Sequence, residues 1–407
     1  MHLSRLAIAG LLCYGVFLAA GVLGFGRDQG SDPQLIKIVS SLPRTGSART
    51  QTDTMVNGVR MALEEVDYKI GDFTIEYRDW DDATAAAGTW TAEAESANAD
   101  AAAKDPDVMV YIGTYNSGAA KISMPILNVA GLLMISPANT WPGLTKPGVG
   151  DFGEPEIYRP TGKVNFTRVV PADDLQGSRA AEWAKELGAK KVYILDDNEV
   201  YGRGIATIFH DRCDQIGVEV LGHESIDVKA QEFKSLMTSI KSLGPDLIYF
   251  GGTTQSKGGQ IAKDMVAAGL DAKIMGPDGC YESVFISSAG AENVNGRCYV
   301  TFGGLPPERL EKFNRDYKAR FGHTPEGYAV YGYECGRVAI EAIRKAGKKD
   351  RQAIVDAALG LKDFEGALGK WSFDKNGDIS LDMVSGFEVQ NGEFKFVKLL
   401  QAQGPKQ

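Results

Sequence analysis

Histidine and cysteine are scarce in this chain, and their scarcity narrows the chemistry that the chain can perform. Only 4 of the 407 residues are His and 5 are Cys. No two His residues stand at metal-ligand spacing, and no C-x-x-C pair occurs. A G-x-S-x-G nucleophile elbow and a Walker phosphate-binding loop are also missing. We therefore expect no metal, no cofactor and no catalytic residue.

Positive charge is in deficit as well. The chain carries 44 Lys and Arg residues against 53 Asp and Glu, a formal net charge of −9. A general nucleic-acid binder needs a basic surface to neutralise phosphates, so nucleic acid is not an expected partner. The length favours two or three globular domains.

Long apolar runs are absent except at the start of the chain. After Arg5 no charged residue occurs from Leu6 to Gly26. This pattern is typical of a cleaved export signal, and the run is also long enough to serve as a membrane anchor. Residues 1–26 are thus predicted to be a signal peptide or an N-terminal anchor, with the body of the protein in the periplasm. In that oxidising compartment Cys280 and Cys298 either form a disulfide or stay buried as free thiols.

From Leu35 onward short β-branched runs alternate with longer helical patterns. This rhythm predicts an α/β fold with two doubly wound parallel sheets in tandem, separated by an irregular segment at 141–163. The Ala-rich stretch 84–103 is predicted to be one helix, and Pro125 is expected to kink or end the helix at 117–127. The predicted strands cover residues 36–39, 73–77, 108–112, 132–135, 166–170, 191–195, 218–221, 247–250 and 273–275.

The C-terminal part is more helical and ends in a hairpin. Helices are predicted at 307–321, 328–346 and 351–361, and the Asn391-Gly392 pair predicts a tight hairpin turn. These pieces are too few for a third domain, so they are expected to complete the first two.

Two short motifs look like functional signatures but fit simple turns better. Gly202-x-Gly204 lacks the third glycine of a dinucleotide fingerprint. A calcium loop that began at Asp374 would need Gly at its sixth and Glu at its twelfth position, where Ile379 and Ser385 stand, so a β-turn is expected at 374–378. The carboxylate pairs are expected to cap helices: Asp81-Asp82, Asp173-Asp174 and Asp196-Asp197.

Polar side chains follow five predicted strands, at the edge where open α/β sheets bind ligands. Free backbone N–H groups at the helix start after the third strand suit a ligand carboxylate. Any one of these groups alone is ordinary turn chemistry, but five in corresponding positions indicate a binding site. The segments that carry them hold Tyr115, Asn116 and Ser117; Ala138 and Thr140; Tyr201; Thr253; and Asp278.

The order and spacing of several motifs resemble the leucine/isoleucine/valine-binding type of periplasmic solute-binding protein, the type I or Venus flytrap group. The resemblance covers Leu35 to about Leu400. The motifs that carry it are Asn57-Gly58-x-Arg60, Leu133-Met134-Ile135-Ser136-Pro137, Asp197-x-x-x-Tyr201-Gly202-x-Gly204, Met275-Gly276-Pro277 and Trp371-x-Phe373-Asp374.

This resemblance implies two lobes joined by three crossings, with residues 35–168 plus 303–363 in one lobe and 172–299 plus 369–400 in the other. It implies a monomer without enzymatic activity that closes on a small-molecule ligand and delivers it to the permease subunits of an ABC importer. Ser117, Ala138 and Thr140 are implied to hold a ligand carboxylate, and Tyr201 and Asp278 its ammonium group.

Two positions differ from the leucine-binding members of that group. Asp278 stands where those members carry Glu, and Gln51 replaces an aromatic residue of the ligand pocket. The 141–163 segment, with Tyr158 and Arg159, has no counterpart in the shortest members. The ligand therefore stays open among an amino acid, an amide or urea, and a small organic or aromatic acid.

Two other functions remain as alternatives. The same fold tethered by residues 6–26 would suit a membrane-bound ligand sensor, and an α/β enzyme could use the same cleft. The missing nucleophile and His partners argue against the enzyme.

Overall fold

Parallel strands form the first of two large sheets in the computed structural model, which describes residues 32–401. Its neighbouring strands pair in parallel, except that the short β2 runs antiparallel to β3. The strand order is β2 (Lys69–Ile70), β3 (Phe73–Asp81), β1 (Leu35–Leu42), β4 (Val108–Gly113), β5 (Leu133–Ser136) and β6 (Phe166–Arg168).

The second sheet repeats this plan and adds an antiparallel edge. Strands β11, β10, β9, β7 and β8 are parallel to their neighbours, whereas β14 runs antiparallel to both β11 and β15. The order is β15 (Glu393–Leu400), β14 (Val384–Gln390), β11 (Cys298–Gly303), β10 (Lys273–Gly276), β9 (Leu247–Gly251), β7 (Lys191–Asp196) and β8 (Glu219–Ser225). A separate small hairpin joins β12 (Phe364–Gly366) and β13 (Gly369–Trp371).

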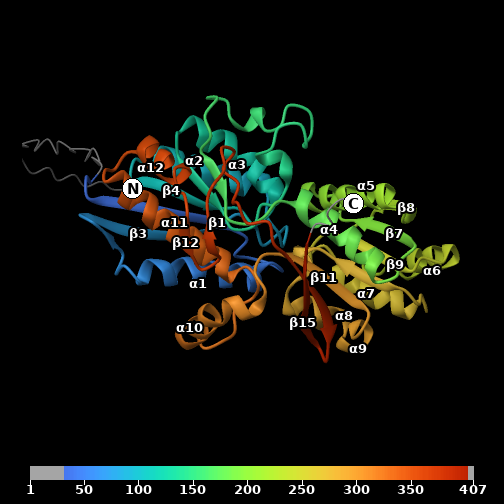
Figure 1. Cartoon of the computed structure of the whole chain (residues 1–407). Helices are drawn as coiled ribbons and strands as arrows, with labels where there is room; N and C mark the ends of the chain where they lie inside the picture. Colours follow the sequence, from blue (N-terminus) through green and yellow to red (C-terminus); the bar gives the residue numbers. More distant parts are fainter. Residues whose placement is uncertain (1–31, 402–407) are drawn as a thin grey trace, which may run out of the picture.

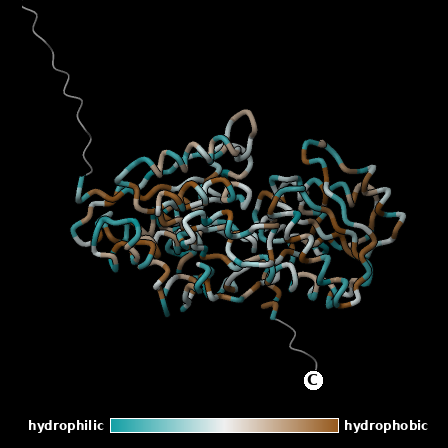
Figure 2. The backbone as a smooth tube through the Cα atoms, turned by 90° about the horizontal axis from the view of Figure 1, so that it is seen from above, coloured by the Kyte–Doolittle hydropathy of each residue, from teal (hydrophilic) through white to brown (hydrophobic). Residues whose placement is uncertain are grey.

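Helices cover each sheet, and the two sheets with their helices lie side by side as two lobes (Figure 1). Hydrophobic segments run through the interior of each lobe, while hydrophilic segments lie mainly outside (Figure 2). The first lobe contains α1 (Arg49–Glu64), α2 (Ala92–Lys104), α3 (Ser117–Val129), α10 (Glu311–Phe321), α11 (Ala329–Ala346) and α12 (Arg351–Leu359). The second lobe contains α4 (Asp173–Glu186), α5 (Val200–Ile216), α6 (Lys234–Leu243), α7 (Gly258–Ala267), α8 (Ser283–Ala289) and α9 (Ala291–Val294).

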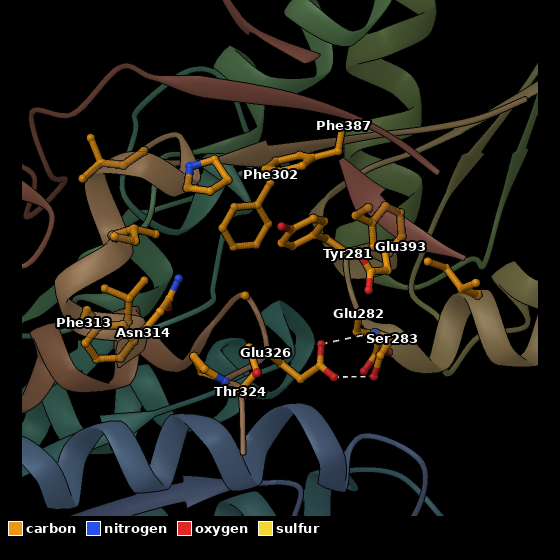
Figure 3. A pocket seen from close by; sticks show the side chains of 18 of the residues that line it. Tyr281, Glu282, Ser283, Phe302, Phe313, Asn314, Thr324, Glu326, Phe387 and Glu393 are labelled. Atoms are coloured by element: carbon orange, nitrogen blue, oxygen red, sulfur yellow. Dashed lines mark hydrogen bonds between the residues drawn. The ribbon is translucent and has the colours of Figure 1, made fainter. Parts of the chain in front are cut away.

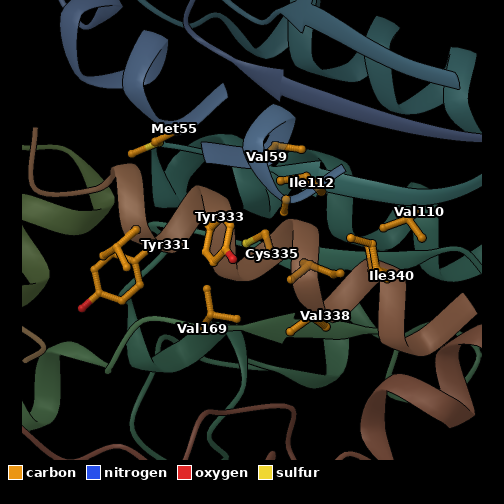
Figure 4. Packing of buried hydrophobic residues seen from close by; sticks show 14 of the residues in the cluster. Met55, Val59, Val110, Ile112, Val169, Tyr331, Tyr333, Cys335, Val338 and Ile340 are labelled. Atoms are coloured by element: carbon orange, nitrogen blue, oxygen red, sulfur yellow. The ribbon is translucent and has the colours of Figure 1, made fainter. Parts of the chain in front are cut away.

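The core of the first lobe is built around the contact between α1 and α11. Gly58 on α1 and Gly332 on α11 bring the two backbones so close that a β-carbon at either position would overlap the other helix. Buried side chains of α11 pack between α1 and the sheet, including Cys335 and Val338 (Figure 4). A helix from late in the chain therefore completes the lobe that the earliest strands begin.

Several local predictions are confirmed. The Asn391-Gly392 pair joins β14 to β15 as a hairpin turn. At residues 374–378 the Gly377 N–H donates to the Asp374 carbonyl at 3.2 Å, which is a β-turn and not a calcium loop. The predicted tandem α/β sheets are also present.

One prediction is wrong, one is excluded in only one of its two forms, and one falls outside the described residues. The helix predicted at 84–103 begins only at Ala92, because Thr84–Gly88 form a turn and Ala83 pairs with Trp90 in a β-bridge. Pro125 does not end its helix, since α3 continues to Val129. The apolar run 6–26 lies outside the described residues, and within residues 32–401 no helix is long and apolar enough to cross a bilayer.

The possible disulfide between Cys280 and Cys298 is absent. Both residues are buried free thiols, as are Cys213 and Cys335. Burial raises the pKa of each of these thiols.

Candidate functional site

A small cavity of about 20 Å³ lies where strand ends of the two lobes meet. Its volume holds about one water molecule, which is far less than the 300–1,000 Å³ of an ordinary small-molecule site. The residues that line it are Tyr115, Asn116 and Ala138 from the first sheet's loops, Tyr201, Thr253, Asp278 and Gly279 from the second sheet's loops, and Tyr328 next to α11.

Parallel strand direction explains why these residues meet. Tyr115 and Asn116 follow β4, and Asn116 is the residue before α3. Tyr201, Thr253 and Asp278 follow β7, β9 and β10 in the second sheet. All these positions stand at the carboxyl ends of parallel strands, which form one edge of each sheet.

Asp278 is the most densely hydrogen-bonded residue of the cavity. Its Oδ1 accepts from the Tyr201 hydroxyl at 2.5 Å and from Gln176 Nε2 at 2.9 Å, and its Oδ2 accepts from the Tyr328 hydroxyl. The Tyr201 oxygen also accepts from the Gly279 N–H at 3.1 Å. Burial nevertheless raises the pKa of Asp278, because these donors are neutral and only partly offset desolvation.

A second buried carboxyl, that of Asp173 at the start of α4, lies close to Asp278. Burial raises its pKa well above the ordinary value, and the charge of Asp278 raises it further. The Asp173 N–H donates to the Thr140 carbonyl at 2.9 Å, but neither carboxyl oxygen has a hydrogen-bond partner in the described structure. Asp173 is therefore not the helix cap that the sequence led us to expect.

The lining of the cavity contains no Lys, Arg or His; the positive charge that lowers the pKa of Asp173 is that of the buried Arg168, which is already paired with Asp378. Further polar atoms of this region are buried without a hydrogen-bond partner within residues 32–401: Tyr115 Oη, Asn116 Oδ1, Thr140 Oγ1 and Gln176 Oε1. Buried polar groups in folded proteins nearly always have partners, so this cluster can accept a polar ligand that carries positive charge.

Six of the nine residues predicted to bind ligand line the cavity: Tyr115, Asn116, Ala138, Tyr201, Thr253 and Asp278. The other three lie beside it. Ser117 Oγ accepts from the Trp141 N–H at 3.4 Å, and Thr140 is fully buried next to Asp173. Gln51 links the lobes, since its Oε1 accepts from the Tyr328 N–H at 3.3 Å and its Nε2 donates to the Tyr281 carbonyl at 3.5 Å.

The sequence did not indicate that Tyr328 lines the cavity or that Gln176 and Asp173 lie beside it. Tyr328 directly precedes α11 in the helical C-terminal part of the chain. It does not follow a strand, so the strand-end pattern could not identify it. Asp173 and Gln176 lie in the first turn of α4. Their sequence positions indicated only that a helix begins there.

The 141–163 segment contacts the second lobe at several points, among them the Lys146–Asp174 ion pair and the Thr145–Asp378 hydrogen bond. The Trp141 indole packs so closely over Gly204 on α5 that a β-carbon there would overlap the ring, and its Nε1 donates to Glu154 Oε2 at 2.8 Å. Tyr158 donates to Glu154 Oε1, and Arg159 donates to the carbonyls of Thr145 and Asn376. Neither Tyr158 nor Arg159 is among the residues that line the cavity.

Comparison with known proteins shows which family shares this sequence and architecture. The periplasmic binding protein family matches residues 35–388. A Leu/Ile/Val-binding protein homolog 2 of Brucella abortus is 30% identical over 290 residues, which cover 70% of this chain and 73% of that protein. The Leu/Ile/Val-binding protein BraC3 of Rhizobium johnstonii is 26% identical, covering 86% and 90% of the two chains. The crystal structure of the leucine-binding protein LivK of Thermotoga maritima superposes with a TM-score of 0.79 at 25% identity, covering 90% and 99%.

These matches span both lobes and agree with the tandem α/β fold. The chain belongs to the periplasmic binding protein family, as a type I extracytoplasmic solute-binding protein of the branched-chain amino acid group and not an enzyme.

Proposed function

We propose that this protein binds a small amino acid between its two lobes and presents it to the membrane permease of an ABC importer. The observation that carries this proposal is the pair of buried carboxyl groups, Asp173 and Asp278, which have no basic partner in the cavity lining. A ligand ammonium group supplies the missing positive charge. Burying a charged ligand without such partners would cost several kcal/mol, on the order of 3–5 kcal/mol when one partner of a pair is missing.

The strand ends of the first sheet suit the carboxylate of the same ligand. Asn116 precedes α3, whose first N–H groups are free to donate, and the Thr140 hydroxyl is buried without a partner. We assign Ser117, Ala138 and Thr140 to the ligand carboxylate, and Tyr201, Asp278 and Asp173 to its ammonium group.

Ligand entry requires the lobes to separate, because the cavity of about 20 Å³ cannot hold an amino acid. We infer that residues 35–168 with 303–363 move as one unit against residues 172–299 with 369–400. The Tyr328–Asp278 and Gln51–Tyr281 hydrogen bonds cross the junction, so opening breaks them. Closure is then favoured by the contacts that the ligand makes only in the closed state.

The relatives named Leu/Ile/Val-binding proteins support an amino acid as the ligand class. Asp278 is one methylene shorter than glutamate, and Gln51 is polar, so we expect a smaller or more polar amino acid than leucine. A periplasmic location and a monomeric state complete the proposal, since ligand delivery requires a diffusing carrier.

A thermal-shift and calorimetric screen tests the proposal. Amino acids, short amides, urea and small organic acids are each titrated into the purified protein. Ligand at 100 times its dissociation constant should add roughly 2.7 kcal/mol of stability. Asp278→Ala should weaken amino-acid binding more than about tenfold, whereas the exposed Asp211→Ala on α5 serves as the matched control.

Ligand analogues test the carboxylate-binding part of the site separately from the ammonium-binding part. The methyl ester and the decarboxylated amine of the ligand should fail to compete if Ser117 and Thr140 hold a carboxylate. Equal competition by these analogues, or stabilisation by organic acids alone, would contradict the assignment.

A further inference from the structure

A second and much larger pocket, of about 580 Å³, opens at the junction of the two lobes (Figure 3). Its volume falls in the range of small-molecule sites. None of its lining residues is shared with the cavity described above. It is formed by α10 and the loop before α11 on one side, and by the start of α8 and the β14–β15 hairpin on the other. We call it the aromatic pocket.

One wall of the aromatic pocket is a cluster of rings. Tyr281 lies at its centre, with ring centroids 4.8 Å from Phe302, 4.4 Å from Phe387 and 5.0 Å from Phe394. Phe313 on α10 lies across the opening from Tyr281 (Figure 3). An apolar or aromatic body can therefore be enclosed by ring faces and edges.

The polar part of the lining is acidic. Glu282, Glu326 and Glu393 line the pocket, and no Lys, Arg or His is among the lining residues. Glu393 is exposed and pairs with Lys395, but within residues 32–401 neither Glu282 nor Glu326 forms an ion pair. Glu326 instead accepts hydrogen bonds from the backbone N–H and the hydroxyl of Ser283.

Glu282 is the residue that most clearly lacks a partner. Its side chain is only 1% exposed; Oε1 accepts from Gln255 Nε2 at 2.6 Å, while Oε2 is buried without a hydrogen bond in the described structure. Burial, with a smaller contribution from the neighbouring Glu326 carboxylate, raises the pKa of Glu282 to about 7, although hydrogen bonds from Thr254 and Gln255 act in the opposite direction. A cation in the pocket would pair with this group and restore its ionised form.

We propose that the aromatic pocket is a second ligand site, which takes a small organic cation made of an ammonium group on an aromatic or aliphatic body. The rings receive the apolar body and attract the cation through their π faces, the Glu326 carboxylate pairs with the ammonium, and the buried Glu282 carboxyl adds negative charge behind the pocket wall. The uncompensated negative charge disfavours an organic acid. Since both lobes line the pocket, its occupant also contacts each side of the junction.

Three matched probes test the charge requirement: 2-phenylethylamine, 2-phenylethanol and phenylacetate, titrated into the full protein by calorimetry. The amine should bind most tightly, the alcohol roughly tenfold more weakly, and phenylacetate not measurably. Equal or tighter binding of phenylacetate would overturn the proposal, as would a complete lack of amine binding.

Variants then locate the bound amine. Glu282→Gln, which keeps the side-chain shape, should weaken amine binding roughly tenfold, and Asn314→Trp should block it by filling the pocket from α10. Glu311→Gln is the matched control, because that carboxylate is exposed on α10 and does not line the pocket. Loss of amine binding in Asp278→Asn, with Glu282→Gln unaffected, would place the amine in the smaller cavity and contradict this site. Failure of the amino-acid screen would leave these outcomes unaffected.

Discussion

The hydroxyl of Tyr328 in the first lobe donates a hydrogen bond to Oδ2 of Asp278 in the second lobe. The two residues stand 50 positions apart in the sequence. They meet because the chain, after forming β7 to β11 of the second sheet, returns to the first lobe at α11. Tyr328 lines the cavity beside Tyr115, whose ring centroid lies 6.0 Å from that of Tyr328 in an edge-to-face arrangement. The Tyr328–Asp278 hydrogen bond therefore helps to hold the unliganded lobes together.

Replacing Tyr328 by Phe should open the unliganded protein. The variant removes one donor from a buried carboxyl, so we expect its free energy of unfolding to fall by about 1–3 kcal/mol. Small-angle scattering should show a larger radius of gyration than for the wild type. Tyr333→Phe is the control, because Tyr333 donates to Glu65 away from the junction and should leave the scattering unchanged. Unchanged scattering in Tyr328→Phe would contradict the role of this hydrogen bond.

Asp173→Asn should stabilise the empty protein and weaken ligand binding. The folded-state pKa of Asp173 is raised, so ionising this buried group costs stability as the pH rises above its ordinary value of 3.8. At neutral pH the variant should gain about 1–3 kcal/mol in the free energy of unfolding, and the gain should vanish near pH 3. Chemical denaturation at the two pH values measures this.

The neighbouring Asp174→Asn is the control for that experiment. Asp174 is half exposed and pairs with Lys146, so its loss should cost less than about 1 kcal/mol. A stabilised Asp173→Asn variant that binds amino acids as tightly as the wild type would remove Asp173 from the ligand site.

Glu95→Gln should flatten the pH dependence of stability. Glu95 is buried against Asp82, accepts from Ser41 at 2.5 Å and from Tyr111 at 2.8 Å, and has its pKa raised by burial to about 7. The folded state thus holds this proton more tightly than the unfolded state, and stability declines as the pH rises from about 4.5 through about 7.

Urea unfolding at about pH 5 and about pH 8 measures this difference. The wild type should lose roughly 1–3 kcal/mol more than Glu95→Gln between the two values. The exposed Glu93→Gln on the same helix should behave like the wild type. Parallel pH curves for wild type and Glu95→Gln would show that Glu95 does not titrate in this range.

Gly204→Val should displace Trp141 from α5. The added side chain would overlap the indole ring, so the 141–163 segment must move and the closed arrangement of the lobes is destabilised. We expect weaker amino-acid binding and a red-shifted tryptophan emission spectrum. Trp141→Ala in the same chain should restore part of the affinity, because it removes the overlap. An additive loss in the double variant would argue against this contact as the cause.

Part of the site could be predicted from the sequence because strand ends are local features. Tyr115, Tyr201 and Asp278 each follow a recognisable strand, and parallel strands bring their carboxyl ends to one edge. The tandem α/β pattern and the Asn391-Gly392 turn were predictable for the same reason.

The remaining site residues depend on tertiary packing that no local pattern contains. Tyr328 reaches the cavity only through the docking of α11 on α1, and Gln176 only through the angle at which α4 meets the second sheet. The start of α2 was misplaced because alanines at 85–87 have high helix propensity, yet the Ala83–Trp90 bridge overrides it.

The position of α11 near the C-terminal end of the sequence limits the order in which the chain can fold. The apolar face of α1, with Met55 and Val59, is covered by residues 329–346, nearly three hundred positions later. The first strands can pair early, but their lobe stays incomplete until almost the whole chain is available. Such long-range closure is typical of slow folding, and the apolar face of α1 stays uncovered until α11 is available. During synthesis the chain is thus most exposed to aggregation and proteolysis in the part that is made first.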